Sequence, residues 1–259
     1  MSAIEISSVA SFVQRTGVRK LLVIVAHPDD PDFGAGATIA AFVEAGVEVS
    51  YCIVTSGDAG GFEDEGQSSI AARREAEQRA AADVYGVRNI HYLREPDGFV
   101  EPSVELRKKL IRVMRTERAD TILTQHPDHS WTSFQRSHPD HLAVGRAVIR
   151  AAYPGVENPY AFPELRTEEG LEPFRIHQIL MMAAPDHLRN VAFEAQDYCE
   201  KKVTALLEHA SQHPDIPKMK AFVREMVERT YTELTGKTGG SAEAFQHVVV
   251  NSDETIAGF

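Results

Sequence analysis

The strongest constraint on the fold is an apolar run near the N-terminus that ends in a cluster of polar side chains. Residues 21–26 read Leu-Leu-Val-Ile-Val-Ala, and residues 27–30, His-Pro-Asp-Asp, follow at once. A short continuous run of Leu and β-branched residues is typical of a strand that is buried on both faces of a parallel sheet. Open α/β sheets place their binding sites at the carboxyl ends of such strands. The sequence therefore predicts a buried strand with a site at its end.

Helical and strand patterns alternate after this run. A helix is expected at residues 34–45, ended by Gly46, and a second strand at residues 47–55. Further helices are expected at residues 68–85, 103–118 and 139–152, and further strands at residues 89–94 and 120–125. Such alternation forms βαβ units, whose strands are parallel. The pattern predicts an α/β fold with a doubly wound, mostly parallel sheet.

The remaining segments are less regular. We expect a short leading helix at residues 5–16 and a long loop or insertion at residues 153–174, which are rich in Pro and Glu. A fifth strand is expected at residues 175–183, followed by helices at residues 197–211 and 217–235.

Composition limits the class of protein. A chain of 259 residues with 43% hydrophobic residues can bury the core of one large α/β domain. A formal charge of −11 argues against nucleic acid or an anionic membrane as the main partner. Cys52 and Cys199 provide no disulfide framework, so we expect a reducing, cytoplasmic location. No apolar run approaches the roughly 18 to 20 residues of a membrane helix, and the first residues carry no signal-type apolar core.

A second polar cluster provides the partner for the first. Residues 138–141, His-Pro-Asp-His, open the predicted helix that follows the strand at residues 120–125. His27 and Asp30 are three residues apart on a turn, and an imidazole with a carboxylate suits zinc. His141 is the best candidate for the third ligand that catalytic zinc sites need. The sequence predicts a metal site for zinc, and the same ligand set also suits iron(II).

The other polar residues of the two clusters are candidates for catalysis. Asp29 lies next to a ligand and can act as general base on a water molecule whose pKa the metal lowers to about 7. His138 is placed to act as a protonated histidine that stabilises an oxyanion and protonates a leaving amine. Asp140 can orient and charge the His138 imidazole by hydrogen bonding. The implied reaction is metal-assisted hydrolysis of an amide or a similar carbonyl.

Each cluster alone also has a structural explanation. The aspartates within residues 29–32 suit helix N-caps, and residues 138–141 suit a polar helix start with histidines facing solvent. Because both clusters follow strands of one predicted parallel sheet, we favour a shared metal site.

The tetrapeptide His-Pro-Asp-His also occurs at residues 126–129. We prefer the copy at residues 138–141 as the metal ligand, because it opens an apolar helix that would hold the ligand on a rigid element. The earlier copy lies in a loop with Trp131 and Phe134. It is expected at the rim of the substrate site or simply exposed.

These residues make the chain similar to the LmbE-like, or PIG-L, family of zinc-dependent sugar N-deacetylases. Residues 26–30, Ala-His-Pro-Asp-Asp, and residues 138–141 carry the resemblance. Weaker matches follow in family order at residues 55–58, Arg74 with Glu77, Leu93 with residues 97–98, residues 209–212 and residues 242–245. The combination is specific, although each weaker match alone is not.

The resemblance implies a Rossmann-like fold and a complete set of site residues. It implies zinc ligands His27, Asp30 and His141, the general base Asp29, a charged His138 at the oxyanion tuned by Asp140, and substrate contacts from Arg74 and Asp97. Family substrates resemble N-acetylglucosamine joined to inositol, malate, another sugar or a lipid-linked inositol, and some relatives cleave a thiol conjugate. We expect residues 1–259 to form one domain, with a core at about 20–155 and a helical and extended C-terminal part, about 156–259, that completes the pocket.

Two of the expected substrate contacts leave alternatives open. Some family members carry a tyrosine two residues before the histidine that matches His138, and this position is Arg136 here. A guanidinium can replace that oxyanion donor or recognise an anionic group of the substrate. For Arg74, the alternative is a solvated helix face beside Glu77 or Gln78.

The leading functional prediction is therefore a metal-dependent N-deacetylase of an N-acetylglucosamine conjugate, with an amidase of a larger sugar-thiol conjugate as the alternative. A nucleotide-binding oxidoreductase is disfavoured, because Gly34 and Gly36 match the dinucleotide fingerprint but Ile39 stands where its third Gly or Ala should be. A non-catalytic carbohydrate-binding protein is the third hypothesis. We expect a small-molecule sugar conjugate as substrate, no nucleic-acid partner and no membrane insertion; a homo-oligomer is compatible with the sequence.

Overall fold

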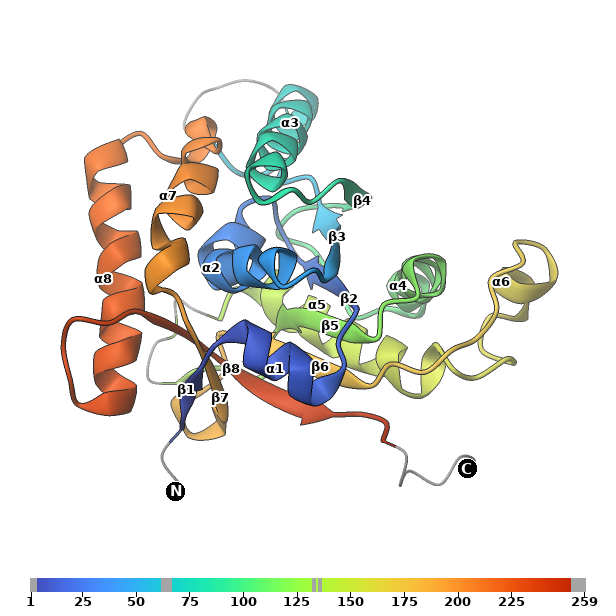
Figure 1. The fold of residues 1–259 in the computed structure, drawn as a ribbon. Coiled ribbons are helices and arrows are strands. Elements are labelled where there is room, and N and C mark those ends of the chain that lie inside the picture. The colour runs from blue at the N-terminus through green and yellow to red at the C-terminus, as the bar shows by residue number, and fades with distance from the viewer. Residues whose placement is uncertain (1–3, 62–66, 132–133, 135–136, 253–259) are drawn as a thin grey trace.

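The computed structural model describes residues 4–61, 67–131, 134 and 137–252. Within these residues, eight strands form one sheet, and helices cover both of its faces (Figure 1). The strands are β1 Ile6–Ser7, β2 Lys20–Val25, β3 Glu48–Thr55, β4 Asn89–Glu95, β5 Thr121–Gln125, β6 Gln178–Met182, β7 Val191–Glu194 and β8 Ala242–Val249. The helices are α1 Val9–Thr16, α2 Asp30–Glu44, α3 Gln67–Tyr85, α4 Val104–Glu117, α5 Pro139–Arg150, α6 Pro163–Thr167, α7 Cys199–Leu207 and α8 Ile216–Thr235.

The sheet is mostly parallel, as the sequence predicts. Its strand order is β1-β7-β8-β6-β5-β2-β3-β4, and β8 runs antiparallel to both of its neighbours. The other pairings are parallel. An α/β fold with a doubly wound, mostly parallel sheet is therefore confirmed.

The side chains of β2 alternate between two hydrophobic layers. Leu21, Val23 and Val25 pack in a cluster that includes α2 and α3, while Leu22 and Ile24 pack in a cluster that includes α4 and α5. A strand with apolar side chains on both faces needs helices on both sides, which explains the continuous apolar run.

The strand order reverses at β2, and this reversal places the site. From β2 the chain continues to β3 and β4 on one side, and then crosses to β5 and β6 on the other. In open α/β sheets, such a switch point leaves a crevice outside the carboxyl ends of the two central strands. The cluster at residues 27–30 follows β2, and the cluster at residues 138–141 comes after β5. The two polar clusters therefore open on the same crevice.

Several elements differ from the sequence-based expectations. Residues 5–16 form a short strand, β1, before helix α1, and the expected loop at 153–174 contains α6. Strands β7 and β8 were not predicted at all. The sequence of β8 is Ala-Glu-Ala-Phe-Gln-His-Val-Val, in which the buried Glu243 interrupts the apolar residues. It therefore lacks the continuous apolar run that identified the strands of the core. Its antiparallel pairing between β6 and β7 nevertheless joins the C-terminal part to the main sheet.

In Figure 1, α7 and α8 lie side by side next to α2, on the opposite side of the molecule from α6. No helix among the described residues is long and apolar enough to cross a membrane. Cys52 and Cys199 are both buried and free.

Candidate metal centre

A tight turn after β2 fixes the first two predicted ligands. The backbone N–H of His27 donates to Asp30 Oδ2 at 2.7 Å, and Asp29 between them adopts a left-handed conformation with φ 90°. Gln125, the last residue of β5, donates from Nε2 to Asp30 Oδ2 at 2.7 Å and accepts the Ala26 N–H at 3.0 Å. This glutamine was not predicted from the sequence. It ties the end of β5 to the turn that carries both ligands.

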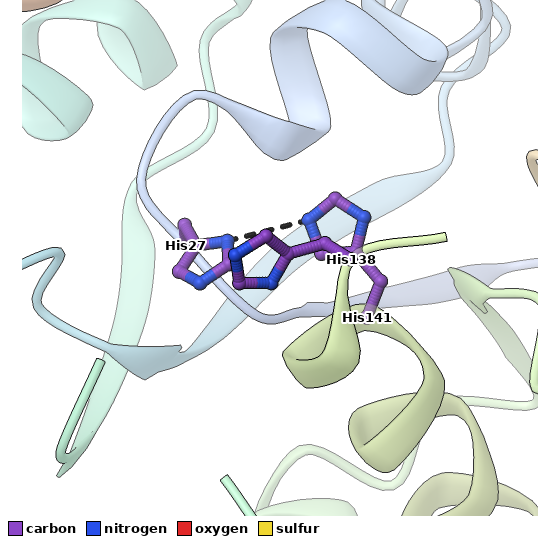
Figure 2. Close-up of side chains that lie close together, drawn as sticks. All are labelled: His27, His138 and His141. Carbon is purple, nitrogen blue, oxygen red and sulfur yellow. Dashed lines mark hydrogen bonds between the residues drawn. The ribbon is translucent and has the colours of Figure 1, made fainter. Parts of the chain in front are cut away.

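His141 completes a compact set of donor atoms with His27 and Asp30. His141 lies in the first turn of α5, and its Nε2 is 3.3 Å from His27 Nδ1 (Figure 2) and 3.0 Å from Asp30 Oδ1. His27 Nδ1 is 3.4 Å from Asp30 Oδ2. A tetrahedral ion with ligands at about 2.0–2.1 Å sets neighbouring ligand atoms roughly 3.3 Å apart. The two imidazoles and the carboxylate therefore fit a small divalent ion such as zinc.

Two buried carboxylates hold the other nitrogen of His27. Its Nε2 lies 3.0 Å from Asp97 Oδ1 and 3.1 Å from Asp140 Oδ2. A metal-ligating histidine usually donates its second ring N–H to such a group, which fixes the tautomer. The carboxylates thus favour the proton on Nε2 and leave Nδ1 as the donor to a metal.

The same contacts favour positive charge at this position. Burial lowers the pKa of His27, but the hydrogen bonds with Asp140, Asp30 and Asp97 outweigh it and raise the pKa to about 12. A metal ion at this place would take the position of the Nδ1 proton, since a ligating histidine is neutral, and the same negative charges would stabilise it.

These contacts change the expected roles of Asp97 and Asp140. Asp140 was expected to orient His138, but its carboxylate binds His27 and accepts the backbone N–H groups of Gly98 and Val100 at 2.7 and 3.2 Å. Asp97 was expected to contact substrate, but its second oxygen accepts the Ala59 N–H at 3.2 Å. Both carboxylates are buried and engaged with the protein. Their geometry is that of groups that position a ligand.

His138 lies beside His27 and His141, the two predicted ligand histidines, as Figure 2 shows. Its ring centroid is 4.9 Å from that of His27 and 5.3 Å from that of His141. Burial, and then the positive charges of His27 and His141, lower the pKa of His138. The structure therefore favours a neutral His138, where the sequence led us to expect a protonated one. Its Nδ1 accepts the Asp140 N–H at 3.2 Å as the N-cap of α5, which leaves the ring hydrogen on Nε2.

Arg74 is a buried partner of Asp29. Its guanidinium donates to the carbonyl oxygens of Pro28 at 2.9 Å and Gly57 at 3.1 Å, and to Asp29 Oδ2 at 3.4 Å. Only 5% of Arg74 is exposed, so it does not lie on a solvated helix face. A side chain at Gly57 would collide with the guanidinium, which explains the glycine there. Arg74 therefore positions the turn, and the substrate contact predicted for it stays a prediction.

Asp29 has an acidity suited to proton transfer. Its side chain is 18% exposed and lies beside Arg74, in the turn between the predicted ligands His27 and Asp30. Burial, and then the negative charge of Asp30, raise the pKa of Asp29 to about 6, although Arg74 pulls it down. A carboxyl group with such a pKa can accept a proton near neutral pH and also release it.

A buried network from α3 and the C-terminal part supports Asp29. The Asp29 N–H donates to Gln78 Oε1 at 2.8 Å, and Gln78 Nε2 donates to Asp32 Oδ2 at 3.0 Å. The ring of His209 binds the same Asp32 oxygen at 2.9 Å. The match at residues 209–212 indicated that this segment mattered, but its contact with Asp32 could not be predicted from spacing.

The other His-Pro-Asp-His copy follows directly after β5, and its histidines have other partners than the donor set. His126 Nε2 contacts Gln246 Oε1 at 2.8 Å, and the His129 ring stacks on Phe134 with a centroid distance of 5.6 Å. Besides the donor set of His27, Asp30 and His141, two further clusters among the described residues bring metal-capable atoms together: His27 with His138 and His141, and His27 with Asp97 and Asp140. Neither includes His129. Arg136, expected at the oxyanion or the substrate, lies outside the described residues.

A cavity of about 300 Å³ adjoins the metal centre. Asp30 and His141 form part of its wall, and Phe33, Met182 and Phe222 contribute apolar surface. Residues from α8 and β8 also line it, so the C-terminal part borders the space in front of the ligands.

Comparison of the sequence with known protein families shows which family it belongs to. Residues 22–152 match the model of the PIG-L family, described as GlcNAc-PI de-N-acetylase. The chain belongs to the PIG-L family. The resemblance predicted from the sequence is thereby confirmed.

Several proteins and solved structures similar to this PIG-L protein are named as deacetylases. Diacetylchitobiose deacetylase of Thermococcus kodakarensis is 32% identical over 200 residues, which cover 76% of this chain and 72% of that protein. A probable N-acetyl-alpha-D-glucosaminyl L-malate deacetylase 2 of Bacillus cereus is 26% identical over 242 residues, covering 88% and 94%. The solved N,N'-diacetylchitobiose deacetylase from Pyrococcus horikoshii has a TM-score of 0.81 and 29% identity, covering 93% of this chain and 89% of that one. The fold of this PIG-L protein is therefore the LmbE-like deacetylase fold.

Proposed function

We propose that this PIG-L protein is a metal-dependent deacetylase that hydrolyses the N-acetyl amide of an N-acetylglucosamine-type conjugate. The names of its relatives support this substrate class, since they include deacetylases of diacetylchitobiose and of a GlcNAc-malate conjugate. The observation that carries the proposal is the compact donor set of His27, Asp30 and His141, with Asp29 in the same turn between the first two.

The donor set defines the cofactor that we propose. His27, Asp30 and His141 would hold zinc, with iron(II) as the alternative. When bound, the ion supplies Lewis-acid chemistry, which polarises the amide carbonyl and makes a water molecule more acidic. Asp97 and Asp140 keep the proton of His27 on Nε2, away from the donor nitrogen.

Asp29 acts as the base and then as the acid. It takes a proton from the attacking water and passes it to the nitrogen of the breaking amide, so that the products are a free amine and acetate. Arg74 holds one carboxylate oxygen and Gln78 holds the backbone, so the base keeps its orientation.

His138 stabilises the developing oxyanion as a neutral donor. Since its Nδ1 caps α5, the Nε2–H is available to the substrate oxygen. This role needs no positive charge on the ring, in agreement with the lowered pKa of His138. Arg136 remains a proposed second donor or a contact for an anionic substrate group.

The cavity beside the ligands favours a second candidate. A volume of about 300 Å³ with apolar walls from Phe33, Met182 and Phe222 exceeds what an acetyl methyl group needs. An amidase of a larger sugar-thiol conjugate would also use such a space. The two functions differ in the acid that they release.

The test measures release of primary amine and of acetate from a panel of N-acetylglucosamine conjugates. The protein is assayed as purified, after chelation, and after addition of zinc or iron(II). Turnover that vanishes with chelator and returns with one metal supports the deacetylase and identifies its ion. Amine release without acetate, from a larger conjugate, would support the amidase instead.

Asp29→Asn provides the matched variant. It should retain the metal and lose turnover, because the amide cannot accept the proton of the attacking water. Retained turnover in this variant would eliminate Asp29 as the base. Sugar binding that survives both chelation and Asp29→Asn, without amine release, would point to a carbohydrate-binding protein.

A further inference from the structure

Helix α2 is broken one turn after the predicted metal ligand Asp30. Ala35 has φ −150° and ψ 16°, which is not helical, so the first turn is separated from the body of the helix. The body carries Ile39 and Phe42 into the core, whereas the first turn carries Asp30. A break of this kind leaves backbone N–H and C=O groups that need new partners.

A buried ion pair from the C-terminal part supplies these partners. Lys202 on α7 donates from Nζ to the Phe33 carbonyl at 2.7 Å. Glu243 on β8 accepts the N–H of Thr38 at 2.8 Å and that of Ala37 at 3.4 Å. In an unbroken helix the Ala37 N–H would donate to the Phe33 carbonyl. Here Lys202 binds the Phe33 carbonyl and Glu243 binds the Ala37 N–H in place of that hydrogen bond.

The pair is deeply buried and closely fitted. Lys202 Nζ lies 2.5 Å from Glu243 Oε1, and the two side chains are 0% and 4% exposed. A side chain at Gly36 would lie 3.0 Å from Lys202 Cγ, so the backbone at the break approaches the lysine stem closely. A buried ion pair is costly to desolvate, and hydrophobic residues can often replace one without loss of stability. A contribution to fold stability is therefore a weak explanation for the presence of a charged Lys202 and Glu243 here.

We infer that Lys202 and Glu243 are positioning residues for the metal centre, because they hold the broken start of α2 in the conformation that presents Asp30. Both residues border the same cavity as Asp30 and His141. The inference rests on the proposed metal site but not on the identity of the substrate.

The test compares zinc affinity with fold stability. Metal-free protein is titrated with zinc against a chromophoric chelator, and thermal unfolding is measured on the same samples. Lys202→Met should raise the zinc dissociation constant about 10- to 100-fold, as loss of an outer contact to a metal site does. Leu165→Ala, a core truncation in α6, is the control: it should lower the melting temperature and leave zinc affinity unchanged.

Charge reversal separates positioning from simple ion pairing. The double variant Lys202→Glu with Glu243→Lys restores an ion pair, but it places an acceptor against the Phe33 carbonyl and a donor against the Thr38 N–H. We expect zinc affinity to stay as low as in Lys202→Met. Wild-type affinity in the reversed pair, or in Lys202→Met, would overturn the inference.

Glu243→Gln covers the case in which a charged variant fails to fold, since it keeps the shape and one acceptor oxygen. It should weaken zinc binding several-fold, and unchanged binding would count against the inference. Because the readout is zinc binding, failure of the sugar panel would contradict the proposed function and leave this inference standing.

Discussion

Two copies of one tetrapeptide, at residues 126–129 and 138–141, share one local hydrogen bond, but only the second begins a helix. In each copy, the backbone N–H of the aspartate donates a hydrogen bond to Nδ1 of the first histidine. The N···N distance is 3.1 Å in the first copy and 3.2 Å in the second. His-Pro-Asp-His thus has a conformational preference of its own, in which the histidine acts as a local cap. The turn alone does not make a site.

The segment after each turn makes the difference. The second copy continues into α5, which carries His141 to Asp30 and Asp140 to His27. The first copy stays in a loop, where His129 packs against aromatic rings. A ligand needs a rigid element that points it at the other ligands, and the second copy has one.

The largest effect should separate the last histidines of the two copies. His141→Ala removes one of three proposed ligands, so zinc affinity should fall by more than the roughly 10- to 100-fold that outer contacts cost, and activity should be lost. His129→Ala should leave the zinc content unchanged. Metal analysis after dialysis measures both. The reverse result would assign the metal to the first copy.

The first histidines should differ in turnover. His138→Asn keeps an acceptor for the Asp140 N–H but loses the proposed oxyanion donor, so kcat should fall about 10²- to 10³-fold with zinc retained. His126→Asn should lower stability by about 1 kcal/mol through the lost contact with Gln246, with kcat unchanged. Steady-state kinetics at saturating zinc distinguishes the two. Equal kcat values for both variants would remove His138 from the reaction.

The aspartates should differ in metal affinity. Asp140→Asn weakens the support of His27 Nε2, and the zinc dissociation constant should rise about 10- to 100-fold. Asp128 is the matching aspartate of the first copy, but it belongs to none of the metal-capable groups found among the described residues. The Asp128→Asn variant should therefore bind zinc normally. An Asp140→Asn variant with normal affinity but reduced kcat would restore the role first expected for Asp140, at His138.

The two tetrapeptides also show which features of the fold and the site can be predicted from the sequence. The strands of the core and the meeting of residues 27–30 with residues 138–141 could be predicted, because continuous apolar runs identify buried parallel strands and such strands align their carboxyl ends. The choice between the two tetrapeptides depended on the apolar helix after the second, which is a local feature.

The side-chain partners could not be predicted. Whether Asp140 faces His138 or His27 depends on how α5 sits against β2, and the roles of Arg74 and Asp97 depend on their burial beneath the turn. Strand β8 was missed since the burial of Glu243 depends on Lys202, which lies far away in the sequence. Contacts between distant segments decide each of these cases, and no local pattern encodes them.

The smallest effect concerns the charge of His138 in the metal-free protein. Burial and the positive charges of His27 and His141 lower its pKa in the folded state, so the unfolded chain binds this proton more tightly. His138 should therefore make the folded state less stable as the pH falls through about 6.5, the ordinary histidine value. Removing it in His138→Asn should flatten the loss of stability between about pH 7 and pH 5.5. The change should stay well below 1 kcal/mol, because the ring is partly exposed to screening solvent.

Urea unfolding of the chelated wild type and the chelated variant at the two pH values measures this difference. Comparing the two proteins cancels the contributions of the other histidines, including that of His27, whose raised pKa adds stability as the pH falls through about 6.5 in both proteins. A steeper loss of stability in His138→Asn would mean that the folded state favours a charged His138. The oxyanion donor would then be an imidazolium, and the neutral role argued from the α5 cap would be wrong.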